Sequence, residues 1–211
     1  MHPAPVDSKP SKTAFSVWGS DAEARALVQA AMSVLRRSSA KALTVSDVLE
    51  EAGLSTRAFY RHFHSKDELI LAVYQYDNRR SIERLRSRIA GAASTLDALA
   101  QWVEGSLALG FAPRQARRTM TLWREGGRIW AQYPGEYKAI VEGLVEPLTD
   151  VLERGRQDGT FPCTDPQLDA LTIHAVVWRL IERRLGGDTS LDPASAAAYV
   201  LRFCLPALTG P

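Results

Sequence analysis

The sequence contains only two cysteines among its 211 residues, Cys163 and Cys204, and they stand far apart. This spacing excludes a C-x-x-C pair, so neither a disulfide framework nor a zinc site is expected, and a reducing cytoplasm fits. No apolar run approaches the roughly 20 residues of a membrane-spanning helix. The first residues also lack the basic-then-apolar order of a signal peptide. We therefore expect a cytoplasmic protein without a bound metal.

The sequence also lacks a strong excess of charge of one sign and the common catalytic motifs. Its net charge is only +2, so any affinity for nucleic acid must come from a local patch and from dimerisation. The absent motifs are G-x-S-x-G, G-x-x-x-x-G-K-[ST], H-E-x-x-H and G-x-G-x-x-G. With 45% hydrophobic and 24% charged residues, the composition is that of an ordinary globular protein. We expect neither an enzyme nor a cofactor.

The most informative stretch is residues 44–73, where two short predicted helices and a glycine turn lead into a third helix. Thr44 can cap the first helix. Gly53 stands where a left-handed residue ends that helix at little steric cost. Ser55 can then cap the second helix. This order is the layout of a helix-turn-helix DNA reader.

The second helix of this stretch divides into two arcs at about 100° per residue. The apolar arc carries Ala58, Phe59 and Phe63. The opposite arc carries Arg57, Tyr60, Arg61 and His64. No acidic residue occurs between Ser55 and Lys66, which suits contact with the negative backbone of a duplex. The sequence thus predicts a helix that packs by its aromatic face and presents its cations to a major groove.

Residues 52–69 closely resemble the signature of TetR-like (TetR/AcrR) transcriptional regulators, in the run Ala-Gly-Leu-Ser-x-x-x-Phe-Tyr-x-His-Phe-x-Ser-Lys-x-Glu-Leu. The resemblance is specific across residues 20–80 and concerns architecture beyond them. It implies that the helix at 55–63 enters the major groove. It also implies that Tyr60, His62 and Lys66 touch the DNA backbone.

The same resemblance implies that Thr56, Arg57 and Arg61 face bases or nearby phosphates. Arg57 stands where many members have glycine or a small residue, and it could read a guanine or hold a phosphate. On helical geometry alone, His62 could equally be a buried packing residue. The complete predicted DNA-binding set is Thr44, Ser55, Thr56, Arg57, Tyr60, Arg61, His62 and Lys66.

The helical pattern continues to the end of the chain, so we expect an all-α fold in three parts. A flexible arm covers 1–19, where Lys9 and Lys12 could brush DNA. A helix-turn-helix domain with its connecting helix covers 20–89, its first helix capped by Ser20. A ligand-binding and dimerisation domain covers 90–211. Within it, Gly126-Gly127 should interrupt one helix, as a kink or as a bulge toward a cavity. Pro147 should bend the next helix, and Gly155 and Gly159 should stop it.

The last two predicted helices, at about 165–184 and 192–208, carry apolar residues on more than one face. Small residues such as Ala194 and Ala198 permit close approach of a neighbouring helix. Such a pair can bury one face in its own domain and one against a second copy. The resemblance implies a four-helix homodimer interface here, whereas the alternative is that both helices simply complete the monomer core.

Aromatic residues concentrate before these helices, within 36 positions, and arginines accompany them. An apolar pocket with a few polar groups is what a small-molecule site needs, and an arginine there could meet a carboxylate or phosphate. The alternative is ordinary core packing, and His174 is expected to pack rather than bind. The candidate pocket residues are Trp102, Phe111, Met120, Trp123, Arg124, Trp130 and Tyr137.

These features together predict a ligand-responsive, DNA-binding transcriptional regulator. We expect a dimeric repressor on a palindromic operator, released by a small hydrophobic or amphipathic effector. A helix-turn-helix recombinase would need a second domain with catalytic carboxylates or a nucleophile, which residues 95–208 do not show. A protein-binding module without DNA contact is disfavoured by the acid-free segment at 55–66.

Overall fold

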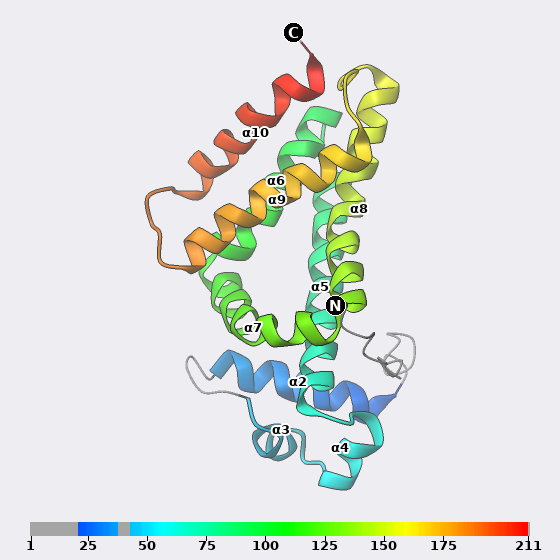
Figure 1. Ribbon diagram of the computed structural model, residues 1–211, viewed down its shortest axis with the longest axis vertical. Coiled ribbons are helices and arrows are strands. Elements are labelled where there is room, and N and C mark those ends of the chain that lie inside the picture. Colours follow the sequence, from blue (N-terminus) through cyan, green and yellow to red (C-terminus); the bar gives the residue numbers. More distant parts are fainter. Residues whose placement is uncertain (1–20, 38–42, 211) are drawn as a thin grey trace, which may run out of the picture. The chain divides into compact units, whose positions relative to one another are not determined.

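The computed structural model describes residues 21–37 and 43–210, and every regular element in those ranges is an α-helix (Figure 1). The expected all-α class is therefore confirmed. The arm expected over 1–19, with Lys9 and Lys12, lies outside the described residues, as does Ser20. The helices are α2 (Ala22–Arg37), α3 (Val45–Ala52), α4 (Thr56–His62), α5 (Lys66–Ala90), α6 (Thr95–Phe111), α7 (Pro113–Gln132), α8 (Pro134–Asp158), α9 (Pro166–Leu185) and α10 (Pro193–Thr209).

The chain forms two compact units that meet inside α5, between Tyr76 and Asp77. The first unit contains α2, α3, α4 and the beginning of α5. The second contains the rest of α5 and the helices from α6 onward. The boundary expected at residue 90 falls at the end of α5, whereas the two units divide a little before the middle of that helix. None of the helices in the described ranges combines the length and apolarity needed to cross a bilayer.

The first unit is built by local caps and an aromatic core. The Thr44 hydroxyl accepts a hydrogen bond from the Asp47 N–H at 3.1 Å, and the Ser55 hydroxyl accepts one from the Ala58 N–H at 3.2 Å. Gly53 ends α3 with φ of 63°, in the left-handed region that glycine tolerates best. Asp21 caps α2 by accepting from the N–H groups of the next turn. The predicted turn between α3 and α4 is therefore present.

The second unit packs around α6, which contacts α7, α8, α9 and α10. Trp102 of α6 is fully buried, and its indole N–H donates to the Leu144 carbonyl of α8 at 3.2 Å. Burying this large ring contributes apolar stabilisation while the hydrogen bond satisfies its one polar group. Leu148, Leu152 and Phe161 are equally buried in the same core.

Single residues join α6, α7 and α8. Ala112 is the C-cap of α6 and the N-cap of α7, and Tyr133 plays both roles between α7 and α8. A proline opens α7 and α8, at a position where its missing N–H has no helical partner to lose. Three long helices are thus joined with almost no loop.

Glycine and proline positions within these helices differ in part from the sequence expectation. The helix α7 runs through Gly126 and Gly127 without interruption, and α8 continues across Pro147. Gly159 ends α8 with φ of 80°. Gly155 lies inside α8, so its expected role as a stop is wrong. Its hydrogen faces the Phe161 ring, and this close approach explains the glycine.

Candidate nucleic-acid interface

Helix α4 separates a buried aromatic face from an exposed polar one. Phe59 and Phe63 are fully buried, with ring centroids 5.9 Å apart. Tyr60 is 58% exposed, although its ring edge still packs against Phe59 at 5.2 Å. Thr56, Arg57 and Arg61 are exposed beside it. The fold therefore holds α4 by one side and leaves the other side accessible.

Two acidic side chains from the start of α2 lie against the end of α4. The Glu23 carboxylate is 2.8 Å from Arg61 Nη1 and 3.0 Å from His62 Nε2. Asp21 lies 3.7 Å from the same imidazole nitrogen. The pKa of Asp21 is lowered, first by its hydrogen bond from the Ala24 N–H and also by the His62 charge. The stretch that lacks acids along the sequence thus has acids beside it in space.

His62 is consequently less accessible than a phosphate-contacting residue would be. Only 12% of its side chain is exposed, and its outer nitrogen faces Glu23 and Asp21. This placement lies close to the buried alternative that helical geometry left open. Arg61 remains 58% exposed in its side chain despite its ion pair.

The beginning of α5 completes the interface. Ser65 accepts from the Glu68 N–H at 3.1 Å, and the Glu68 carboxylate accepts from the His64 N–H at 2.7 Å. Lys66 is the first residue of α5 and is partly exposed. The N–H groups at a helix start and an adjacent ammonium both favour a phosphate. Thr44 and Ser55 stand at the starts of α3 and α4, where each hydroxyl can still donate one hydrogen bond.

The candidate effector residues differ in their surroundings. Trp102 belongs to the core of the second unit, where its ring lies 6.4 Å from that of His174. The His174 ring stacks on Trp178 at 6.5 Å, and burial lowers the pKa of this imidazole. Trp130 and exposed Tyr137 do meet, with centroids 4.8 Å apart.

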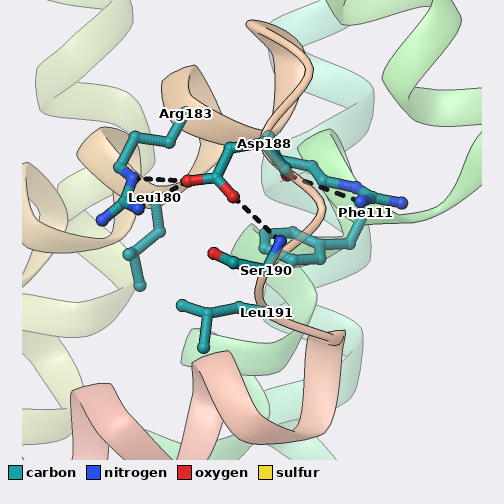
Figure 2. A pocket seen from close by; sticks show the side chains of 7 residues that line it. Phe111, Leu180, Arg183, Asp188, Ser190 and Leu191 are labelled. Atoms are coloured by element: carbon teal, nitrogen blue, oxygen red, sulfur yellow. Dashed lines mark hydrogen bonds and ion pairs between the residues drawn. The ribbon is translucent and has the colours of Figure 1, made fainter.

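The other candidates lie along α7 or at its border. Met120 is half-buried against the core, whereas Trp123 is 42% exposed and Arg124 is exposed. Phe111 lines a shallow depression between the end of α6 and the connection from α9 to α10 (Figure 2). The Arg184 guanidinium lies 5.7 Å from the centre of its ring.

The charged and polar groups that line this depression are hydrogen-bonded to one another. Asp188 accepts from Arg183 Nε at 2.9 Å and from the Ser190 N–H at 2.8 Å (Figure 2). The hydrogen bonds from Ser190, and then the Arg183 guanidinium, hold the pKa of the Asp188 carboxyl far below its usual range. These contacts fasten the connection between α9 and α10, and they leave little free hydrogen-bonding capacity for a ligand.

Sequence reasoning missed a buried ion pair in the second unit. Asp77 of α5 is only 8% exposed, and its Oδ1 lies 2.9 Å from Nε of Arg118 on α7. Asp77 precedes a basic segment of α5 that includes Arg79, Arg80 and Arg84. The one useful signal was an aspartate at the start of that basic segment, but its partner comes from another helix.

Comparison with known proteins supports a helix-turn-helix in the first unit. Residues 27–73 match the sequence profile of "Bacterial regulatory proteins, tetR family". The HTH-type transcriptional regulator YfiR of Bacillus subtilis is 27% identical over 146 residues, which cover 66% of this chain and 68% of YfiR. The profile spans most of α2 through the first turns of α5.

Solved structures share the fold over most of the chain. A TetR-family regulator from Rhodococcus sp. has a TM-score of 0.69 at 23% identity, covering 87% of this chain and 96% of its own. FadR of Bacillus subtilis, in complex with stearoyl-CoA, has a TM-score of 0.67 at 19% identity, and the match covers 87% of this chain and 98% of FadR. A regulator from Saccharomonospora viridis, in complex with choline, has a TM-score of 0.70 at 17% identity, and the match covers 85% of this chain and 94% of that regulator.

The profile match falls on the helix-turn-helix that the caps and the turn glycine predict, and the structural likeness extends through the helices that follow. The residues described bring together no group of three His, Cys, Asp or Glu able to hold a metal. Residues 27–73 are therefore similar to the DNA-binding region of bacterial regulatory proteins of the tetR family, and the chain shares the fold of solved TetR-like structures.

Proposed function

We propose that this protein is a homodimeric repressor that binds a palindromic operator and leaves it when a small hydrophobic or amphipathic effector binds. The observation that carries the proposal is the division of α4 into a fully buried aromatic face and an exposed face with Thr56, Arg57, Tyr60 and Arg61. In a helix-turn-helix, such an exposed face is the one that enters the major groove. On this proposal the protein acts in the cytoplasm.

On this proposal the exposed residues divide into base readers and backbone contacts. Arg57 projects from the first turn of α4, where a guanidinium can reach the two acceptors of a guanine edge. Lys66, Tyr60 and the hydroxyls of Thr44 and Ser55 hold phosphates, which fix the register of the helix. His62, packed against Glu23, supports the position of α4 more than it contacts DNA.

An exposed apolar surface on α9 and α10 supports the homodimer. Leu168 and Leu171 on α9 are 64% and 50% exposed, and Tyr199 and Phe203 on α10 are 47% and 61% exposed. Each pair is spaced to lie on one side of its helix. Large exposed apolar side chains on neighbouring helices are typical of an interface. These residues fall within the helices at about 165–184 and 192–208 that the sequence assigned to dimerisation.

The effector role rests on the second unit and on α5. Related regulators of the same fold are solved with stearoyl-CoA and with choline, which supports a small-molecule site in the helices after α5. Because α5 is one helix from Lys66 to Ala90, a displacement of its second half moves its first half also. An effector releases DNA only by the difference between its affinities for the two states.

Selection of duplexes from the organism's own genomic DNA, followed by gel-shift titration, tests the proposal. Lys66→Ala is expected to weaken all sequences alike and to reduce the salt slope of log K by about 0.9, for one lost phosphate contact. Arg57→Ala is expected to cost about 1–3 kcal/mol at particular base pairs and to relax preference there.

Arg86→Ala is the matched control, because it removes the same charge from an exposed ion pair in the second unit. It should leave affinity and preference near those of the parent protein. Equal, sequence-independent losses for Arg57→Ala and Lys66→Ala would assign Arg57 to a phosphate. Selection of no preferred sequence at all would overturn the proposed operator binding.

Removing the acid beside α4 should strengthen binding to random duplex. Glu23→Gln deletes the carboxylate that pairs with Arg61, so this guanidinium becomes available for a phosphate. The salt slope should steepen by about one contact. Glu146→Gln is the control, since its ion pair with Arg86 has the same N···O distance of 2.8 Å and lies outside the first unit. An unchanged or shallower slope for Glu23→Gln would contradict this expectation.

A further inference from the structure

A group of charged and polar side chains lies between α5 and α7 within the second unit. Asp77, Ser81 and Arg84 follow one another along one side of α5, and Arg118 approaches from α7. Arg118 Nε is 2.9 Å from Asp77 Oδ1. Arg84 Nη2 donates to the Ser81 hydroxyl at 2.8 Å, and that hydroxyl donates to the Asp77 backbone carbonyl at 3.0 Å.

The Asp77–Arg118 contact brings the charges together without satisfying their hydrogen bonds. Arg118 Nε and Nη2 and Asp77 Oδ1 are all buried atoms without a hydrogen-bond partner. The 2.9 Å separation of Nε and Oδ1 therefore lacks the alignment that a hydrogen bond requires. Buried donors left unpaired carry a substantial desolvation cost. A bidentate arginine–carboxylate pair would have avoided that cost.

Several guanidinium groups also lie close together at this place. Asp77 faces the guanidinium groups of Arg118, Arg84 and Arg80, which all act on its carboxyl, although burial dominates and raises its pKa. The pKa of Arg84 is lowered, first by burial and next by the like charge of Arg118. Asp77 is thus poorly oriented toward Arg118, and the guanidinium groups of Arg84 and Arg118 repel each other. Such a site favours an additional oxygen anion.

We propose that Arg118 and Arg84 form the binding site for the anionic group of the effector, a carboxylate or a phosphate, and that Asp77 occupies this site when no effector is bound. The inference rests on the proposed effector-controlled function, which it narrows to anionic amphipathic molecules. An incoming oxyanion accepts from the unpaired N–H groups of Arg118 and separates Asp77 from α7. Because Asp77 belongs to α5, binding loosens a tie on the helix that continues into the DNA-binding unit.

Binding of decanoate, decyl phosphate and decan-1-ol to the full chain, measured by calorimetry, tests this site. The three probes share a tail and differ in the head group. The parent protein should prefer both anions over the alcohol. Asp77→Asn removes the internal competitor and keeps the shape, so this preference should rise about tenfold while alcohol binding stays unchanged. The comparison of decanoate with decyl phosphate shows whether the site prefers a carboxylate or a phosphate.

The double variant Asp77→Asn/Arg118→Gln keeps the proposal testable if one single variant fails to fold, because no buried charge is left without a partner. In this variant the ratio of the affinity for the anionic probes to the affinity for decan-1-ol should fall to about one. An unchanged preference in either variant overturns the site, as does failure of the parent and Asp77→Asn to bind any anionic probe or inorganic phosphate.

Release of operator DNA, followed in parallel, separates this site from the proposed function. If the preferences change as expected but no probe releases DNA, the anion site stands and its coupling to repression fails. If decanoate releases DNA with the same anion preference in all variants, the effector function stands and the assignment to Arg118 and Arg84 is wrong.

Discussion

Phe203→Glu is expected to convert the homodimer into a monomer and to weaken operator binding by at least about a hundredfold, the gain that joining two binding modules supplies. Phe203 is 61% exposed in the single chain and lies one turn from Tyr199 on α10. In a two-fold dimer every substitution occurs twice. Two carboxylates would therefore enter an apolar interface without partners, and each costs several kcal/mol.

Light scattering during gel filtration measures the mass, and a gel shift on the selected operator measures the affinity. Leu96→Glu is the matched control, because Leu96 is an apolar residue on α6 with 45% exposure that lies off α9 and α10. This control should remain dimeric and bind DNA normally. A dimer that persists in Phe203→Glu would show that another surface joins the protomers.

Gly155→Ala is expected to destabilise the second unit by about 2–3 kcal/mol, the upper part of the range for overpacking a core. A methyl group at this position would lie 2.1 Å from Phe161 Cδ2 and 2.9 Å from Cε2 and Cγ. Phe161 is fully buried, and its N–H donates to the Gly155 carbonyl at 2.9 Å. Neither the ring nor its backbone can retreat without losing core contacts or this hydrogen bond.

Urea denaturation at a fixed protein concentration measures the effect, since dimerisation makes the apparent stability depend on concentration. Gly127→Ala is the control: it makes the same change inside a helix, and a methyl group there would meet nothing within 4 Å. It should stabilise the protein by about 0.5–1 kcal/mol, because alanine loses less backbone entropy in a helix. Equal effects at the two positions would refute the steric account of Gly155.

The helix-turn-helix could be predicted because its signals are local. Thr44, Ser55 and Gly53 act within one turn of their own position, and the apolar arc of α4 follows directly from helical periodicity. Local signals could not reveal the acidic residues that lie beside α4, because those residues are distant in the sequence. Glu23 reaches Arg61 from 38 positions earlier in the chain, and only the packing of α2 on α4 brings them together.

The candidate effector site could be predicted far less well, for a related reason. Aromatic residues at helical spacing look the same in a sequence whether they fill a core or surround a cavity. Trp102 proved to be a core residue, whereas Trp130 and Tyr137 meet near the surface. The Asp77–Arg118 pair was invisible because each residue stands among charges that would ordinarily be solvated.

The one-residue joints at Ala112 and Tyr133 restrict how this domain can diverge. Adding or deleting a residue inside α7 would turn everything beyond it by about 100°, and no flexible loop is present at either joint to absorb that rotation. Relatives with the same joints should therefore keep these helices at constant length. Changes in what they recognise would then arise by exchange of side chains on a conserved frame.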